Sequence, residues 1–117
     1  MPAAVKPTRR ERNRYVAVTL DSKRPLDRKE VGQALWDSYL RLFGESGAAD
    51  AGLWLMDWEE NRGVIKVTHK CVETLRQAVA TLQSINQTPV RPRIIGVSGT
   101  LKKTREHWLK TSTKKNL

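Results

Sequence analysis

Hydrophobic residues recur with the period of a β-strand in some segments of this chain and with the period of an α-helix in others. Residues 14–20 alternate between apolar and polar side chains, which predicts a first strand. Asp27 and Glu30 then form a variant of the capping box, which predicts a helix over residues 28–43. The apolar stripe of this helix consists of Val31, Leu35, Tyr39 and Leu42.

The second half of the chain repeats this change of period. Gly44 is expected to end the first helix, and residues 45–52 have the composition of a loop. Two β-rich runs then surround a short turn that contains Asn and Gly, which predicts a hairpin. The elements expected after residue 52 are strands over 53–58, 64–68 and 90–97, a helix over 71–86 and a last helical segment over 100–110.

The order of the expected elements is β-α-β-β-α-β followed by a C-terminal helix. This order is typical of the α+β class with a ferredoxin-like (RRM-like) fold, a four-stranded antiparallel sheet with both main helices on one face. Many functions use this fold, RNA recognition among them. The third strand lacks the aromatic pair of RNA-recognition motifs, so base stacking by that arrangement is not expected.

The positive charge of the chain is concentrated at its two ends. Of 117 residues, 22 are Lys or Arg and 12 are Asp or Glu, which gives a formal net charge of +10. Residues 1–14 contribute +4 and residues 91–117 contribute +7, whereas residues 15–90 contribute −1. A polyanion such as nucleic acid would neutralise the charge of both ends. Basic ends could also serve only to keep the protein soluble, and composition alone does not favour either explanation.

One domain of modest size fits this length. We expect a flexible basic arm over residues 1–13, a single α+β RNA-binding domain over 14–110 and a basic tail over 111–117. No signal peptide, basic amphipathic segment or long apolar run is visible, so a soluble, cytoplasmic protein without a membrane partner is expected. The single cysteine, Cys71, is expected in the core, and the sequence shows no cluster of metal ligands.

Residues 91–103, RPRIIGVSGTLKK, pass from the last strand through Gly96 and Gly99 into a basic helix. The spacing matches neither a catalytic G-x-S-x-G turn nor a P-loop. Ser98 or Thr100 can cap the helix, and the glycines permit close approach of another backbone. Phosphate binding and a plain strand-to-helix connection are about equally consistent with this stretch alone.

Two further groups of residues are candidates for contacts. Trp36, Leu40 and Phe43 form a second apolar stripe on the first helix, to be covered by a protein partner or by Trp108 and Leu109 of the C-terminal helix. The pair His69 and Lys70 follows the third strand and could contact RNA, although His69 could equally cap the second helix. The acidic turn at Glu59 and Glu60 would repel phosphate, so RNA contact is expected away from that hairpin tip.

Three stretches, residues 7–18, 63–76 and 85–104, together resemble protein component 2 of archaeal ribonuclease P, the Pop-five family of eukaryotes. Their order and spacing are more specific than any one of them alone. Val18 and Thr19 depart from the pattern, since family members carry an aromatic and an acidic residue there.

The resemblance implies a non-catalytic subunit of the ribonucleoprotein that removes the 5′ leader from precursor tRNA. Catalysis would belong to the RNA and its Mg²⁺ ions, and the chain itself would bind no cofactor. The expected partners are ribonuclease P RNA and protein component 3, a TIM-barrel-like subunit, in a heterotetramer with two copies of each. Precursor tRNA would be contacted indirectly.

Carried onto this sequence, the resemblance places the protein contact at Trp36, Leu40 and Phe43. The residues expected at RNA share a basic or hydrogen-bonding side chain and lie near the chain ends or at the ends of strands. They are Arg9, Arg10, Arg12, Arg14, His69, Lys70, Arg91, Arg93, Ser98, Lys102, Lys103 and Arg105.

Two other functions remain open on the sequence. A different small basic RNA-binding or ribosomal protein would have the same charge and fold. An acylphosphatase-type enzyme uses this fold as well, but no Gly-rich phosphate loop follows the first strand.

Overall fold

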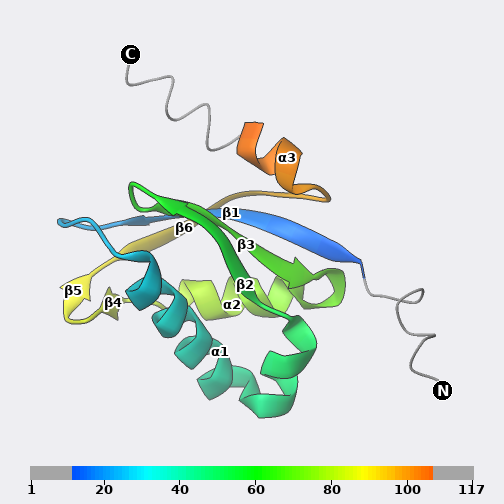
Figure 1. The fold of residues 1–117 in the computed structure, drawn as a ribbon. Helices are drawn as coiled ribbons and strands as arrows, with labels where there is room; N and C mark the ends of the chain where they lie inside the picture. Colours follow the sequence, from blue (N-terminus) through cyan, green and yellow to red (C-terminus); the bar gives the residue numbers. More distant parts are fainter. Residues whose placement is uncertain (1–11, 107–117) are drawn as a thin grey trace.

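The computed structural model describes residues 12–106, so the predicted arm over 1–13 and the predicted tail over 111–117 lie almost wholly outside the described residues. The elements follow one another as shown in Figure 1. They are β1 (Asn13–Asp21), α1 (Arg28–Ala51), β2 (Trp54–Glu59), β3 (Arg62–Thr68), the 3-10 helix η2 (His69–Cys71), α2 (Val72–Ala80), β4 (Ser84–Ile85), β5 (Thr88–Pro89), β6 (Arg91–Ser98) and α3 (Leu101–Thr104).

The main sheet has four strands in the order β2-β3-β1-β6, and all neighbouring strands are antiparallel. Helices α1 and α2 cover one face of this sheet, and α3 lies on the opposite side (Figure 1). The α+β class and the four-stranded antiparallel sheet are therefore as the sequence predicts. The short strands β4 and β5 form a separate hairpin.

Strand register assigns residues to the two faces. Val16 of β1 lies opposite Ile65 of β3, and both are buried in a core cluster with Leu35 and Tyr39 of α1 and Leu75 of α2. Residues one position along each strand point to the other face, because side chains alternate across a sheet. We call that side, which carries α3, the open face.

Helix α1 is longer than predicted. Gly44 leaves helical geometry (φ 75°, ψ 177°), but the helix resumes after it and ends at Ala51. Gly52, whose backbone is left-handed (φ 57°, ψ 42°), is the C-cap residue. The predicted loop over 45–52 is therefore wrong, since Ala48 and Ala51 turn inward and are buried against the core. The capping box at Asp27 and Glu30 is confirmed.

The apolar stripe of α1 also differs from the prediction at one position. Leu42 is 45% exposed. The inward position one turn after Tyr39 is occupied by Phe43, whose ring centroid lies 4.7 Å from that of Tyr39. The prediction that Leu42 follows Tyr39 in the buried stripe is therefore wrong, and Phe43 takes that position.

Helix α2 ends at Ala80, six residues before the predicted end at residue 86. Asn86 and Gln87 have positive φ and turn the chain between β4 and β5. Leu82 and Ile85 are spaced like helix neighbours, but they are buried in a second cluster beside Leu20 and are reached by a loop and a strand.

The hairpin of β2 and β3 is confirmed, and its turn is made by Glu60 (φ 52°) and Asn61 (φ 60°). The Asn61 side-chain oxygen accepts a hydrogen bond from the Leu26 backbone N–H at 2.7 Å. Its amide nitrogen donates to the Arg24 carbonyl at 3.1 Å. The hairpin tip is thereby attached to the segment that leads into α1.

Candidate nucleic-acid interface

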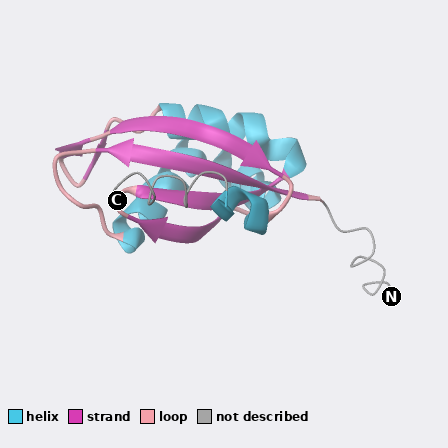
Figure 2. Cartoon of the chain, turned by 90° about the horizontal axis from the view of Figure 1, so that it is seen from above, coloured by secondary structure: helices cyan, strands magenta, loops and turns pink. Residues whose placement is uncertain are grey.

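Three chain segments meet at one end of the main sheet. Register places Asn13 of β1 opposite Thr68 of β3, and Tyr15 of β1 opposite Ser98 of β6. The start of β1, the end of β3 and the end of β6 are therefore side by side, and α3 begins at the same end (Figure 2). We call this region the basic end; it comprises Arg12, Arg14, Lys66, His69, Lys70, Ser98, Lys102 and Lys103.

Most of the predicted RNA-binding residues with described positions fall in the basic end. Arg12, His69, Lys70, Lys102 and Lys103 are exposed there. Arg9 and Arg10 lie outside the described residues. Lys66, which the sequence reasoning did not single out, joins the group because its register partner is Tyr15. Only knowledge of the strand pairing could have identified it.

A backbone hydrogen bond attaches the beginning of the described chain to the end of β3. The His69 N–H donates to the Arg12 carbonyl at 2.8 Å, and the His69 Nδ1 lies 3.3 Å from the same oxygen. His69 does not cap α2, because Cys71 occupies that N-cap and no side chain there makes a capping hydrogen bond. These contacts hold Arg12 next to the pair His69 and Lys70.

The stretch between β6 and α3 is a capped turn. Thr100 is the N-cap residue of α3, and its hydroxyl accepts from the Lys103 N–H at 3.2 Å. Ser98 Oγ accepts from the Thr100 N–H at 3.3 Å. No other part of the protein approaches Gly99 closely: a Cβ there would meet no heavy atom within 4 Å, and its φ is not in the left-handed region.

Arg91 and Arg93 lie at the other end of β6. Arg93 pairs with Thr19 and Arg91 with Asp21, whereas Ser98 pairs with Tyr15 near the basic end. Seven residue steps along an extended strand separate Arg91 from Ser98 by roughly 20 Å. Arg91 and Arg93 therefore do not lie next to Lys102 and Lys103 of α3.

The far end of the sheet carries charges of both signs. Arg93 lies 3.8 Å from Asp21, and Arg62 lies 3.3 Å from Glu60. A hollow of about 470 Å³ is lined by Thr19, Arg62 and Arg93 together with acidic neighbours. The Thr19 hydroxyl and the Arg62 Nε are buried there without a hydrogen-bond partner among the described residues.

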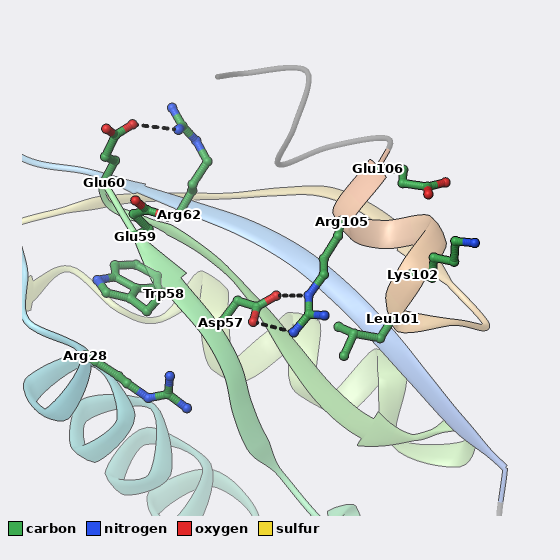
Figure 3. Close-up of a pocket in the computed structure, with 10 residues that line it drawn as sticks. All are labelled: Arg28, Asp57, Trp58, Glu59, Glu60, Arg62, Leu101, Lys102, Arg105 and Glu106. Atoms are coloured by element: carbon green, nitrogen blue, oxygen red, sulfur yellow. Dashed lines mark hydrogen bonds and ion pairs between the residues drawn. The ribbon is translucent and has the colours of Figure 1, made fainter. Parts of the chain in front are cut away.

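Arg105, also predicted to contact RNA, is paired within the protein. Its Nε and one terminal nitrogen donate to the two Asp57 carboxylate oxygens at 2.7 and 2.8 Å (Figure 3). These bonds raise the pKa of Arg105. They bridge a cleft of about 940 Å³ between α3 and the β2–β3 hairpin, while Lys102 points away from Asp57.

The apolar stripe predicted for a protein partner lies on α1, away from the open face. Trp36 is 39% exposed, whereas Leu40 and Phe43 pack against the main core. The fold thus uses two of the three residues, and Trp36 remains at the surface. Trp108 and Leu109, the alternative cover for this stripe, lie outside the described residues.

Residues 12–106 contain neither a cluster of metal-binding side chains nor a membrane-spanning helix. Over this range no three His, Cys, Asp or Glu side chains gather in a way that could hold a metal ion. None of the helices formed by the same residues is both long enough and apolar enough to cross a membrane. Cys71 has a free thiol and is half-buried beside the core.

Comparison with known proteins gives one consistent family. The model of the Rpp14/Pop5 family matches residues 14–109. "Ribonuclease P protein component 2" of Thermococcus kodakarensis is 36% identical over 110 residues, which is 92% of each chain. The protein of the same name from Methanococcus aeolicus is 30% identical over 109 residues, covering 93% of this chain and 81% of that protein.

A solved structure has the same fold at low sequence identity. A chain in the cryo-EM structure of yeast ribonuclease MRP superposes with a TM-score of 0.65 and 16% identity, covering 92% of both chains. At that identity the likeness concerns the fold alone. The family model and the relatives cover most of the sequence, and the chain therefore belongs to the Rpp14/Pop5 family.

Proposed function

We propose that this chain is a non-catalytic protein subunit of ribonuclease P, the ribonucleoprotein that removes the 5′ leader from precursor tRNA. The observation that carries the proposal is the basic end, where cations from three separate chain segments converge in a member of the Rpp14/Pop5 family. Relatives named as ribonuclease P subunits support this function over that of an unrelated ribosomal protein.

The role of the basic end is to hold RNA by its phosphates. Clustered lysines and arginines gain affinity for RNA by releasing the counterions condensed on it, without reading sequence. Arg12, Lys70, Lys102 and Lys103 are exposed and carry no ion pair among the described residues. Arg9 and Arg10, which lie outside the described residues, are proposed to contact RNA as well.

Arg91 and Arg93 form a separate and weaker RNA contact in this proposal, because Asp21, Glu59 and Glu60 lie at the same end of the sheet. Arg105 contributes through the position of α3, since its charge is directed to Asp57. The expected Mg²⁺ ions belong to the RNA of the complex, where they supply the catalytic chemistry, and this chain supplies cations and shape.

The expected protein partner is component 3 of ribonuclease P, a TIM-barrel-like subunit, with two copies of each chain in the assembly. Its proposed contact is the surface of α1 around Trp36, beside the partly buried Leu40 and Phe43. That surface lies on the helical side of the sheet, so protein and RNA could bind at the same time (Figure 1). The complex is proposed to act in the cytoplasm.

We also infer that the fold is of the ferredoxin-like type. The support is the strand order β2-β3-β1-β6, with antiparallel neighbours and both longer helices on one face. The hairpin of β4 and β5 is an addition between α2 and β6.

The experiment is reconstitution. Purified chain should bind a ribonuclease P RNA transcript and raise its cleavage of precursor tRNA when the other protein subunits are present, and should cleave nothing alone. Cleavage by RNA-free protein that is lost on a single point substitution would overturn the non-catalytic role. Failure to bind the transcript at low salt would overturn the proposed function itself.

A further inference from the structure

We propose that Trp54 and Tyr15 form a stacking platform for unpaired bases of RNA at the basic end of the open face. The inference rests on the proposed function, since it names which part of the RNA this surface would take. It adds a contact made through base rings to the contacts made through phosphates.

Strand register places both aromatic residues in one row across the sheet. Trp54 of β2 lies opposite Lys66 of β3, Lys66 lies opposite Tyr15 of β1, and Tyr15 lies opposite Ser98 of β6. The next residue of β2, Leu55, packs against the core, so Trp54 belongs to the open face. Two strand spacings separate Trp54 from Tyr15 by about 10 Å, with Lys66 between them.

Trp54 is exposed to an unusual extent for its type. It is 62% exposed, more than any other large hydrophobic side chain in residues 12–106. Trp58, four residues along the same strand, is half-buried, and its indole N–H donates to the Leu26 carbonyl at 2.8 Å. The fold thus uses one tryptophan of β2 for packing and leaves the ring of the other available.

The charge around this row favours RNA over a protein surface. Lys66 lies within the row, and Arg12, His69 and Lys70 lie at the adjoining strand ends. The acidic pair Glu59 and Glu60 is at the opposite end of β2. Cations beside exposed aromatic rings are the combination by which proteins hold single-stranded nucleic acid, because phosphates pair with the cations while bases stack.

The occupant must be unpaired, because the bases of a duplex are stacked on each other and do not offer their faces. The row also explains how this sheet could stack bases although β3 carries no aromatic pair. Its rings come from β1 and β2, and β3 contributes the lysine between them.

The test compares two exposed tryptophans in the full chain, with a ribonuclease P RNA transcript as the probe. Trp54→Ala should weaken binding about 10- to 100-fold at fixed salt, because one stacked base is lost. Trp54→Phe should retain most of the affinity. Trp36→Ala, on α1, is the matched control and should bind RNA like the parent chain.

Two readouts separate stacking from the phosphate contacts. The slope of log affinity against log salt should be the same for Trp54→Ala and the parent, because no charge is removed. A fully paired RNA duplex should not distinguish the two proteins. Equal transcript binding by Trp54→Ala and Trp36→Ala would overturn the platform, as would a loss confined to binding of component 3. A parent chain that binds no RNA would instead overturn the proposed function.

Discussion

Arg105 and Asp57 are joined by two hydrogen bonds of 2.7 and 2.8 Å, and this pair links α3 to β2 across the open face. The pair is partly solvent-exposed, with 51% of the Arg105 and 24% of the Asp57 side chain accessible. Its contribution is therefore that of a well-oriented surface pair and not of a buried one.

We expect a double-mutant cycle of Arg105→Ala and Asp57→Ala to give a coupling energy of about 0.5–1 kcal/mol by chemical unfolding. For RNA binding, Arg105→Ala should cost less than Lys102→Ala, because the Lys102 side chain points away from Asp57. A larger RNA effect at Arg105 than at Lys102 would contradict this assignment.

We expect substitution by alanine to lower the stability of the protein at Gly63 but to leave it almost unchanged at Gly99. A Cβ at Gly63 would collide with the Asp57 carbonyl oxygen and the Trp58 ring, just beyond the register shift between Leu55 and Asp57. A Cβ at Gly99 would meet open space. Gly63→Ala should destabilise the chain by about 1–3 kcal/mol, the usual cost of overpacking. Gly99→Ala should change stability by less than about 0.5 kcal/mol. Thermal unfolding of both variants checks the pair, and equal effects would contradict it.

We expect the contacts of Glu30 to make the folded protein less stable in acid. Arg24 donates to both carboxylate oxygens of Glu30, and the Asp27 N–H and Asn86 side chain add further bonds. These contacts, the Arg24 bonds first, lower the pKa of Glu30 to about 2. A carboxylate with a lowered pKa in the folded state stabilises that state above its unfolded pKa, near 4.5, and the gain disappears as the pH falls towards 2.

The measurement is the melting temperature of the parent chain and of Glu30→Gln at intervals between pH 6 and pH 2. The parent should melt higher at pH 6, and the difference should shrink steadily below pH 4.5 as Glu30 takes up its proton. A difference that stays constant over this range would mean that Glu30 titrates as it does in the unfolded chain.

Much of the fold could be predicted because its strands and the part of α1 before Gly44 carry strong local signals. Alternation in residues 14–20 and the capping box at Asp27 and Glu30 are visible without any neighbour. Residues 45–51 were missed because their Gly, Ala and Ser composition is typical of loops, and only burial of Ala48 and Ala51 makes them helical. Leu82 and Ile85 were wrongly assigned to the second helix because they are three residues apart and both apolar. In the structure Leu82 lies in a loop and Ile85 in β4, and both are buried in the second cluster.

The candidate site was predictable in composition but not in arrangement. Clustered charge at the chain ends indicated which residues could meet RNA. Their grouping depends on strand pairing, which brings Arg12 next to His69 and separates Arg93 from Lys102. Lys66 and Trp54 were missed for the same reason, since neither carries a local signal apart from its row in the sheet.

The central claim, that the basic end holds RNA, is tested most directly by comparing charge removal at the two ends of the sheet. The triple variant combines Arg12→Ala, Lys70→Ala and Lys102→Ala at the basic end. The control is a double variant at the opposite end, Arg91→Ala with Arg93→Ala. Each charge lost from the basic end should weaken binding of a ribonuclease P RNA transcript by about 0.5–1.5 kcal/mol. The triple variant should lower the slope of log affinity against log salt by about 2–3, because roughly one phosphate contact is lost with each cation. The control should change both quantities less. An unchanged slope in the triple variant, or a larger loss in the control, would contradict the account.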